Sequence, residues 1–270
     1  MEFSCKDYKF PLGSGCYVMG ILNITPDSFS DGGLYAEPES AVKRALQIEN
    51  EGAGLLDIGA QSTRPGHTPL SAREEIARLK AALPEIIRRV RIPVSVDTFY
   101  PETAVFAAEN GAHIINDVSG AVSSAMAEII REYELGWVIM HAAEVSGPGL
   151  CGEVHGWLES AAKKACALGV PANQICLDPG LGFGKDAAGC LLLIKNTARV
   201  KVSGFAYLVG GSRKRFIGEC CGNPPFDQRD AGSIAAHTAA ILSGADFIRV
   251  HAVKEAVQAA KVANALLASK

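Results

Sequence analysis

The sequence predicts a single domain of the α/β class with the (β/α)8 barrel (TIM barrel) fold, in which eight parallel strands alternate with helices. Three observations support this prediction. The chain has 270 residues, a length that such a barrel commonly uses as one unit. Eight short apolar segments alternate with longer segments of helical periodicity. Turn residues bound each apolar segment, as is typical of parallel strands covered by helices.

An open, doubly wound parallel sheet is the alternative architecture. That fold commonly carries a G-x-G-x-x-G segment after its first strand. Here the first apolar segment ends at Asn23, and the polar segment that follows lacks this pattern. No Pro-, Gly- or Ser-rich linker divides the chain, so we expect one barrel domain over residues 1–270.

The strands are predicted from apolar runs that end in polar or turn residues. Residues 1–17, which precede the first run, are predicted to form a short leading hairpin or an irregular lid. The eight strands are predicted at Val18–Asn23, Leu55–Gly59, Pro93–Asp97, His113–Asp117, Gly136–His141, Gln174–Asp178, Phe205–Gly210 and Phe247–His251.

Start and stop residues place the helices between these strands. Pro38 and Glu39 open the first helix, and Gly52 ends it. Ser71 and Glu74 form a capping box at the start of the second helix. Helices are predicted over 38–52, 71–87, 101–110, 126–134, 150–169, 188–196 and 229–243, with two more beginning near 212 and 254.

The composition is that of a globular protein with a sizeable core, with 48% hydrophobic and 20% charged residues. The net charge of −3 gives no overall basic bias, so we expect no nucleic-acid partner. No block of Lys and Arg predicts an anionic membrane partner, and no segment approaches the roughly 20 apolar residues needed to cross a bilayer. The acidic Glu2 and Asp7 argue against a signal peptide.

The cysteines indicate a reducing compartment. The chain has eight of them, with no C-x-x-C pair and no spacing typical of a zinc site. Several lie in apolar helical patterns, where a free Cys acts as a small hydrophobic residue. We therefore expect a cytoplasmic protein.

Polar side chains end nearly every predicted strand. In a (β/α)8 barrel these strand ends converge on one mouth, where barrel enzymes have their active sites. A single strand-end Asp often caps the next helix, which is our interpretation of Asp117, but the whole set is hard to explain as caps. The set is Asn23, Asp57, Asp97, Asn116, Asp117, His141, Asp178, Arg249 and His251.

Part of this set predicts binding of a flat heterocycle. Carboxylates, an amide and a cation suit the edge of a ring system with ring nitrogens and an amino group. Phe183, in a segment with three glycines, is expected either to flank the heterocycle or to pack in the core. The residues that offer the polar groups are Asp97, Asn116, Asp178 and Lys214.

Other side chains predict an anion site, because Arg presents a planar fork that matches phosphate oxygens. Ser212 is predicted to open a helix, so its turn can hold a carboxylate or phosphate on free backbone N–H groups. The remaining residues suited to an anion are Asn23, Arg64, Arg249 and His251.

The residues favour binding and charge stabilisation over covalent catalysis. No Ser/His/Asp spacing and no strong cysteine nucleophile is evident. His141 is a candidate general base, although a satisfied strand-end histidine is our preferred interpretation. The polar, glycine-rich segment after Asn23 is predicted to be a loop that closes over a ligand, with Phe29 as its aromatic member.

Eight motifs, in order along nearly the whole chain, resemble those of dihydropteroate synthase, the folate-pathway enzyme that sulfonamides inhibit. The first of them is highly specific. The motifs are GILNITPDSFSDGG (Gly20–Gly33), DIGAQSTRPG (Asp57–Gly66), SVDT (Ser95–Thr98), INDVSG (Ile115–Gly120), Met140-His141, DPGLGFGK (Asp178–Lys185), GSRKRFIG (Gly211–Gly218) and RVH (Arg249–His251).

The resemblance implies a transferase reaction in folate biosynthesis. In it, para-aminobenzoate displaces pyrophosphate from (7,8-dihydropterin-6-yl)methyl diphosphate to give 7,8-dihydropteroate. The family mechanism is dissociative: pyrophosphate leaves first, and the amine traps a pterin-methyl cation. The resemblance also implies sulfonamides as inhibitors. The residues to which it assigns catalytic roles are Asn23, Asp97, Lys214 and Arg249.

Carried over by position, the resemblance assigns three substrate sites and one metal. It implies that Mg²⁺ binds at Asn23. From the residues themselves, apolar faces on the last helices suit a homodimer. The implied pterin site is Asp97, Asn116, Met140, Asp178, Phe183 and Lys214; the diphosphate site is Asn23, Arg249 and His251; and the aminobenzoate site is Phe29, Thr63, Arg64, Pro65 and Ser212.

Departures from the family pattern leave two alternatives. Gln61 stands where the family usually has Glu, and Ala252 stands where an Asp often follows the RVH motif. Residues 142–154 depart from the family's usual pattern rich in Met, Gly and Pro. One alternative is a methyltetrahydrofolate–corrinoid methyltransferase, which needs no diphosphate site, so Arg249 argues against it. The other is a degenerate paralogue that binds pterin without turnover, which Gln61 and Ala252 keep open.

Overall fold

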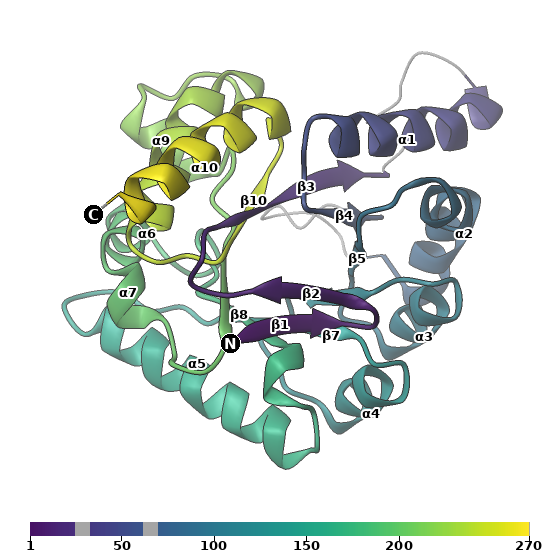
Figure 1. Cartoon of the computed structure of the whole chain (residues 1–270), viewed down its shortest axis with the longest axis horizontal. Coiled ribbons are helices and arrows are strands. Elements are labelled where there is room, and N and C mark those ends of the chain that lie inside the picture. The colour runs from purple at the N-terminus through teal and green to yellow at the C-terminus, as the bar shows by residue number, and fades with distance from the viewer. Residues whose placement is uncertain (25–32, 62–69, 270) are drawn as a thin grey trace.

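The computed structural model of the chain describes residues 1–24, 33–61 and 70–269. Within these ranges, eight parallel strands form a closed barrel in the order β10–β3–β4–β5–β6–β7–β8–β9, surrounded by helices (Figure 1). The predicted (β/α)8 barrel is therefore confirmed. The barrel strands are β3 (Tyr17–Asn23), β4 (Leu55–Gly59), β5 (Val94–Asp97), β6 (Ile114–Asp117), β7 (Gly136–Met140), β8 (Ile175–Asp178), β9 (Ala206–Val209) and β10 (Phe247–Val250).

The register of the strands places several predicted site residues at one level of the barrel. Asn23 on β3 pairs with Gly59 on β4, and Gly59 pairs with Asp97 on β5. Asp97 in turn pairs with Asn116 on β6. The side chains of Asn23, Asp97 and Asn116 therefore start from paired positions at the carboxyl ends of β3, β5 and β6, where barrel active sites lie.

An antiparallel hairpin closes the opposite end of the barrel. It consists of β1 (Glu2–Cys5) and β2 (Tyr8–Pro11), within the residues for which a leading hairpin or lid was predicted. The rings of Phe3 and Phe10 lie 5.5 and 5.4 Å from that of Phe247, at the start of β10. Figure 1 shows the hairpin lying across the strands. The hairpin is thus remote from the strand ends that carry the polar residues.

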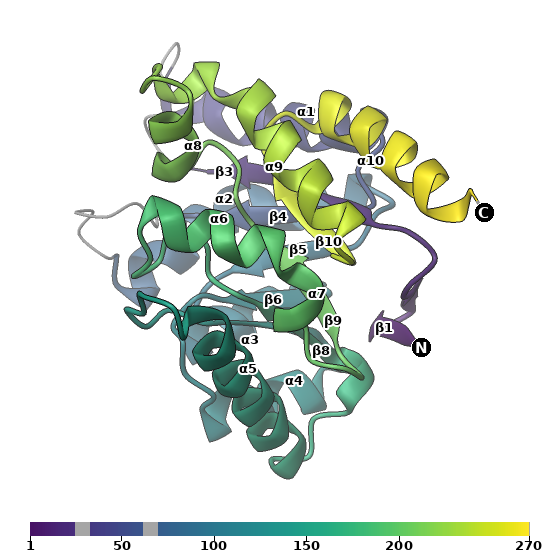
Figure 2. The same ribbon diagram turned by 90° about the vertical axis from the view of Figure 1, so that its left-hand side faces the viewer.

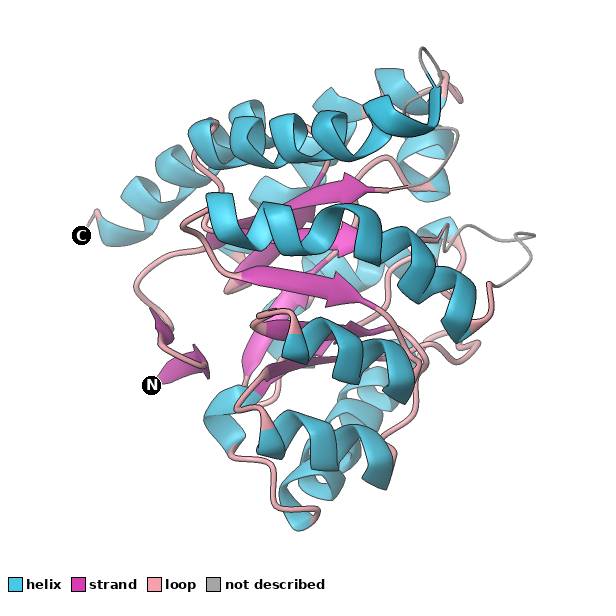
Figure 3. Ribbon diagram, turned by 90° about the vertical axis from the view of Figure 1, so that its right-hand side faces the viewer, coloured by secondary structure: helices cyan, strands magenta, loops and turns pink. Residues whose placement is uncertain are grey.

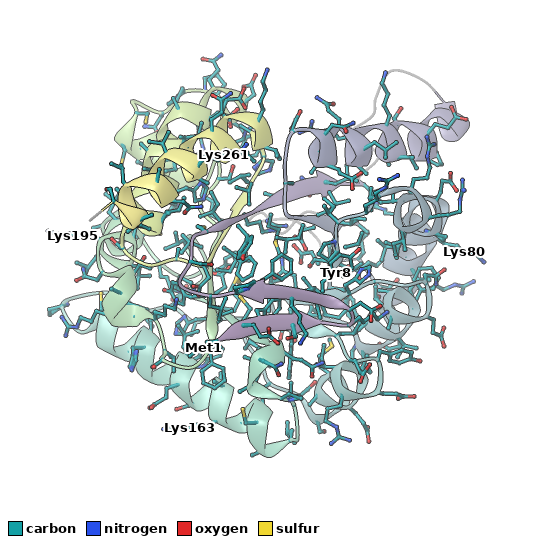
Figure 4. The ribbon with its side chains drawn as sticks, in the orientation of Figure 1. Met1, Tyr8, Lys80, Lys163, Lys195 and Lys261 are labelled. Carbon is teal, nitrogen blue, oxygen red and sulfur yellow. The ribbon has the colours of Figure 1, made fainter. Side chains whose placement is uncertain are left out.

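Tyr8, labelled in Figure 4, fastens this hairpin to the barrel. Its hydroxyl donates a hydrogen bond of 2.7 Å to the carbonyl of Arg91, before β5. Its ring packs edge-on against His113, before β6, with centroids 4.9 Å apart. Four labelled lysines mark the outer, exposed helix faces in the same figure, namely Lys80, Lys163, Lys195 and Lys261.

The helices cover the outside of the barrel, as two views at right angles show (Figures 2 and 3). The predicted capping box is present: Ser71 accepts from the amide of Glu74, whose side chain accepts from that of Ser71. The helices are α1 (Gly33–Asn50), α2 (Ala72–Arg89), α3 (Pro101–Glu109), α4 (Ser124–Glu132), α5 (Leu150–Ala167), α6 (Ala187–Lys195), α7 (Thr197–Val200), α8 (Arg215–Cys220), α9 (Asp230–Leu242) and α10 (Val253–Ala268), with 3-10 turns η2 (Ala172–Gln174) and η3 (Phe226–Gln228).

Two predicted helix starts were wrong. Pro38 does not open α1 but lies inside it, where the missing N–H removes one helical hydrogen bond without ending the helix. Ser212 does not open α8, which begins at Arg215 with Lys214 at its N-cap. Arg213 has a φ of 59°, a left-handed conformation that no helical residue adopts, so the helix can begin only after it.

None of the helices formed by the described residues is long and apolar enough to cross a membrane. All eight cysteines lie in described segments and are free. Burial raises the pKa of the Cys5 thiol to about 12, which keeps this residue protonated at neutral pH. Its chemistry is that of an inert core residue.

Candidate active site

An arginine held by two carboxylates lies at the centre of the strand ends. Nε of Arg249, on β10, is 2.6 Å from Oδ2 of Asp57 on β4, and its Nη2 is 3.1 Å from Oδ2 of Asp97 on β5. Asn116, on β6, donates its amide to the same Oδ2 of Asp57 at 3.2 Å. Side chains from four strands are therefore joined in one network.

Burial and charge oppose each other in this network. Burial raises the pKa of Asp97 to about 7, against the lowering effect of Arg249 and with a further increase from Asp57. Burial disfavours the charge of Arg249, but the two carboxylates outweigh it and hold the pKa of Arg249 above its usual value. The network contains a permanent cation and a carboxyl group that can change its charge near neutral pH.

A carboxylate–lysine pair, Asp178 with Lys214, lies beside the Arg249 network. Oδ1 of Asp178, on β8, accepts the amide of Gly180 at 2.7 Å, which fixes the carboxylate. A Cβ built on Gly210 would lie 3.6 Å from Oδ2 of Asp178 and 3.9 Å from the Cβ of Arg249. Asp178 and Arg249 therefore lie on either side of Gly210 at the mouth.

Lys214 completes this pair. Its ammonium group lies 4.4 Å from the centroid of the Phe183 ring and donates a hydrogen bond to the carbonyl of Leu181. Burial lowers the pKa of Lys214 to about 8, while Asp178 acts in the opposite direction. Burial also raises the pKa of Asp178, against the effect of Lys214. Phe183 thus contacts the cation, beside the polar groups, rather than packing only in the core.

Ser212 and His251 are in direct contact. Oγ of Ser212 accepts the backbone N–H of His251 at 3.1 Å and lies 2.9 Å from its Nδ1. The helix start predicted at Ser212 is not there, since α8 begins three residues later. The structure instead joins a residue assigned to aminobenzoate with one assigned to diphosphate.

Met140 ends β7, and His141 follows it, beneath the glycine-rich segment. A Cβ on Gly180 would lie 3.3 Å from Cγ of Met140 and would collide with the carbonyl oxygen of His141. Burial lowers the pKa of His141 to about 4, and its ring packs edge-on against Trp157 at 5.0 Å. Nδ1 of His141 has no hydrogen-bond partner among the described residues, so it is buried but not satisfied.

Lys185, the last residue of the glycine-rich segment, holds backbone groups from neighbouring segments together. Its ammonium donates to the carbonyls of Phe183 at 2.7 Å, His141 at 3.0 Å and Ala143 at 3.4 Å. Burial lowers the pKa of Lys185 to about 8. Lys185 therefore joins the end of β7 to the segment that carries Phe183.

Gln61 belongs to a buried network behind the site. Its amide donates to Oε1 of Glu75 at 3.1 Å, and its own oxygen accepts the backbone N–H of Leu70 at 3.2 Å. The other oxygen of Glu75 accepts the hydroxyl of Thr98 at 2.5 Å. Glu75 is fully buried, and burial raises its pKa. Gln61, at a position where the family usually has Glu, supplies an N–H donor that an ionised Glu would lack.

Some predicted site residues lie outside the described part of the chain. The site also contains a residue for which no role was predicted. Asn23 ends β3 with its side-chain oxygen 3.3 Å from where a Cβ on Gly59 would be. Asp57 was in the strand-end set but received no role, and its position in that set was the available signal. Asp117 accepts the amide of Ser119 in a turn rather than capping α4. The predicted residues Phe29, Thr63, Arg64 and Pro65 lie outside the described residues.

Among the described residues, no group of three or more His, Cys, Asp or Glu side chains could hold a metal ion. Mg²⁺ usually takes one or two protein ligands and completes its octahedron with water and substrate phosphates. The side-chain oxygen of Asn23 is a ligand of the required hard type.

Comparison with known proteins identifies the relatives of this chain. The family model described as "Pterin binding enzyme" matches residues 19–251. A dihydropteroate synthase of Clostridium beijerinckii is 37% identical over 262 residues, which cover 96% of this chain and 97% of that protein. The mitochondrial folate synthesis bifunctional protein of Pisum sativum is 39% identical over 276 residues, 94% of this chain but 54% of that protein. The chain thus spans about half the length of this plant relative.

Solved structures agree with the sequence relatives. Dihydropteroate synthase of Xanthomonas albilineans, solved with 4-aminobenzoic acid, superposes with a TM-score of 0.94 at 38% identity, covering 100% of this chain and 99% of that one. The enzyme of Yersinia pestis, solved in a sulfonamide drug complex, gives a TM-score of 0.90 at 33% identity and covers 100% of both chains. The likeness therefore extends over the whole barrel.

Proposed function

The chain belongs to the family of pterin-binding enzymes that includes dihydropteroate synthase, and from this membership we propose that it condenses para-aminobenzoate with (7,8-dihydropterin-6-yl)methyl diphosphate. The products are 7,8-dihydropteroate and pyrophosphate. The observation that carries the proposal is the arrangement at the mouth, where the Arg249 network and the Asp178–Lys214 pair lie on either side of Gly210.

The Asp178 side of the mouth is proposed to bind the pterin. A carboxylate accepts the N–H groups along the edge of this heterocycle, and a lysine donates to its acceptors. Asn116 adds an amide, and the Phe183 ring and Met140 supply apolar surface beside it. The short contact between Gly180 and Asp178 holds the carboxylate in one orientation, which reduces the entropy lost on binding.

The Arg249 side is proposed to bind the diphosphate, together with His251 and Asn23. Two of the donors of Arg249 are occupied by Asp57 and Asp97, so its guanidinium plane is fixed while Nη1 makes no hydrogen bond to a described residue. When bound at Asn23 beside the phosphates, Mg²⁺ would supply charge neutralisation for the leaving group.

The reaction is proposed to be dissociative. The C–O bond to the diphosphate breaks first, and its electron pair leaves with pyrophosphate, which Arg249 and His251 stabilise. The remaining pterin-methyl cation is stabilised by the ionised carboxylate of Asp97. The amine of para-aminobenzoate then forms the C–N bond and releases one proton, so that atoms and charge balance.

The aminobenzoate site is proposed to include Ser212, at the rim formed by the β9–α8 connection, with Phe29, Thr63, Arg64 and Pro65. Sulfonamides are proposed as competitive inhibitors at the same place, since the Yersinia pestis relative is solved with a sulfonamide drug. The contact of Ser212 with His251 supports the proposal, because an acceptor bound at Ser212 would then lie next to a leaving group bound at His251.

We also propose a homodimer through the last helices, in a reducing cytoplasmic compartment. Large apolar side chains are exposed on neighbouring helices, and α9 packs against both α6 and α10. Exposed apolar side chains on neighbouring helices are typical of an interface when they form one patch. These residues are Leu191 and Leu192 on α6, Leu242 on α9, and Val262, Leu266 and Leu267 on α10. The free cysteines support the compartment.

The test is pyrophosphate release by the purified protein with dihydropterin-methyl diphosphate and Mg²⁺, with and without para-aminobenzoate. Release that depends on para-aminobenzoate and yields dihydropteroate is the expected result. Binding of the pterin without product would instead identify a paralogue without turnover. A methyltransferase would bind the pterin equally well with or without its diphosphate.

A further inference from the structure

One face of α9 holds the backbone that connects two predicted substrate-binding residues. The connection is Gly211–Lys214, between β9 and α8, and it carries Ser212 and Lys214. Three residues spaced by four, Arg229 at the N-cap of α9 and Ser233 and His237 within it, share one side of the helix. Figure 2 shows α9 beside α8 and α10.

Each of the three donates or accepts one backbone hydrogen bond of the connection. The amide of Gly211 donates to Nε2 of His237 at 3.1 Å. The amide of Arg213 donates to Oγ of Ser233 at 2.9 Å, and Nη1 of Arg229 donates to the carbonyl of Arg213 at 3.3 Å. The polar backbone groups on both sides of Ser212 are therefore fixed by α9.

The side chain of Arg213 strengthens this attachment. Its Nε and Nη2 form a bidentate pair with Asp230, at 2.6 and 2.7 Å. Arg213 has a φ of 59°, which is unfavourable for a residue with a side chain. The contacts with Asp230, Ser233 and Arg229 offset that cost, because they exist only when the backbone turns at Arg213 in this way.

Small residues allow α8 and α9 to approach closely enough for these bonds. A Cβ on Gly218 would lie 2.7 Å from Cζ of Arg229, and one on Gly232 would lie 2.8 Å from Cγ2 of Ile217. A larger residue at Gly218 would displace the side chain of Arg229 from its bonds, and one at Gly232 would press on the side chain of Ile217.

The chemistry of His237 distinguishes this arrangement from ordinary core packing. His237 is buried, and burial lowers its pKa to about 4, so the ring is neutral and Nε2 is an acceptor. Nδ1 then carries the proton, and it has no hydrogen-bond partner among the described residues. An apolar side chain would avoid this unpaired donor, but it would leave the amide of Gly211 unpaired instead.

We propose that α9 is a positioning element for substrate binding, in which His237, Ser233 and Arg229 hold the Gly211–Lys214 backbone so that Ser212 reaches His251 and Lys214 reaches Phe183. The kinetic consequence of this inference, a change in KM, rests on the proposed function. Its structural consequence, a fixed Gly211–Lys214 backbone, rests on the contacts alone. The same helix carries Leu242 of the apolar surface, so the two features share one rigid element.

Hydrogen exchange and steady-state kinetics test the proposal. His237→Leu removes the acceptor, His237→Gln offers an amide oxygen in its place, and Thr238→Ala is the matched control. Thr238 is half-buried on the same helix, and its hydroxyl bonds only within α9, to the carbonyl of Ile234 at 2.8 Å. In His237→Leu, we expect amide exchange over 211–213 to accelerate about tenfold or more relative to wild type.

The kinetic prediction separates positioning from general destabilisation. In His237→Leu the KM values for both substrates should rise about tenfold, because the backbone that carries Ser212 and Lys214 is displaced, and kcat should fall much less than in Lys214→Ala. His237→Gln should restore both exchange and KM, whereas Thr238→Ala should change neither.

The contradicting outcomes are equally specific. Exchange over 211–213 that is the same in His237→Leu as in Thr238→Ala would overturn the proposal, as would a loss of kcat at unchanged KM. Absence of dihydropteroate formation by the wild type would overturn the proposed function instead. The exchange comparison would still decide whether α9 holds the connection.

Discussion

Nε of Arg249 lies 2.6 Å from Oδ2 of Asp57, which is fully buried and receives a second hydrogen bond from Asn116. Asp57 is thus the anchor that orients the guanidinium group toward the mouth. The pair links β10 to β4, on either side of β3 in the barrel. The arginine therefore cannot rotate away from the strand ends without leaving a buried carboxylate with no counter-charge from it.

Asp57→Asn tests this anchoring role. The amide retains an acceptor oxygen but loses the charge, so Arg249 should become less well oriented. We expect KM for the pterin diphosphate to rise about tenfold or more, since hydrogen bonds to charged groups contribute about 1.5–3 kcal/mol. Calorimetric binding of the same pterin without its diphosphate should change much less.

Asp246→Asn is the matched control for that experiment. Asp246 is also buried and also pairs with a cation, Lys201, at 2.7 Å, but it precedes β10 at the opposite end of the barrel. This variant should lose stability while KM stays unchanged. Equal changes of KM in the two variants would contradict the assignment of Asp57.

Lys214→Ala should weaken pterin binding and nearly abolish turnover. The ammonium group is the cation of the Asp178 pair, and its removal takes away the charge that most favours the ionised form of that buried carboxylate. The measurement is pterin affinity by fluorescence quenching, together with kcat. Near-normal kinetics would remove Lys214 from the pocket. Lys195→Ala, on an exposed face of α6, provides the control.

Lys185→Met should reduce stability rather than directly remove a binding group. Three carbonyl groups, of Phe183, His141 and Ala143, would lose their shared donor. We expect the free energy of unfolding to fall by about 2–4 kcal/mol, measured by urea denaturation, because unpaired buried acceptors are costly. Lys195→Met should leave it unchanged. A Lys185 variant with wild-type stability would show that the three bonds contribute little.

The pH dependence of kcat/KM should be a narrow bell. Asp97, with a pKa raised to about 7, must be ionised to stabilise the cation, so activity should rise as pH increases through that value. Lys214, with a pKa lowered to about 8, must be protonated, so activity should fall above that value. In Asp97→Asn the acidic limb should disappear along with most of the activity. An unchanged acidic limb in that variant would assign it to another group.

Gln61→Glu should make stability depend on pH. Two carboxyl groups would then share the site of Glu75, and burial with mutual repulsion would raise the pKa of the pair above its unfolded value. Stability is then retained at acidic pH and lost as pH rises through the raised pKa. We expect the variant to be about 1–3 kcal/mol less stable at pH 8 than at pH 5, relative to wild type.

Gln47→Glu provides the matched control for that comparison. Gln47 makes the same kind of hydrogen bond, to Glu51 at 2.7 Å, but on the exposed surface of α1. Solvent screens such a pair, so its pH dependence should stay close to that of wild type. The same pH dependence in both variants would contradict a buried Gln61–Glu75 contact.

The barrel and most site residues could be predicted because local patterns determine them. Short apolar runs with polar ends place Asp97, Asn116 and Asp178 at strand ends whatever the neighbouring strands are. The predicted helix starts at Pro38 and Ser212 were wrong, and at Ser212 a tertiary contact explains the difference. At Ser212, the left-handed turn at Arg213 depends on Asp230, 17 residues later, so no local signal reveals it.

The role of His237 could not be predicted for the same reason. In the sequence, His237 is one of the polar residues in a largely apolar helix, with no partner nearby along the chain. Its partner is the amide of Gly211, 26 residues earlier, and backbone donors leave no pattern in a sequence. Asp57 differs, because its place at a strand end was visible but the choice between anchor and ligand required the position of Arg249.

The hairpin that closes one end of the barrel has a practical consequence for immobilisation. Figure 3 shows the strand arrows pointing away from the side on which both chain ends lie. A biotin or affinity handle joined to either end would therefore attach the protein to a sensor surface by its closed side. The mouth would face the flowing solution, so the ligand affinities of the variants above can be compared on one chip without steric blocking of the site.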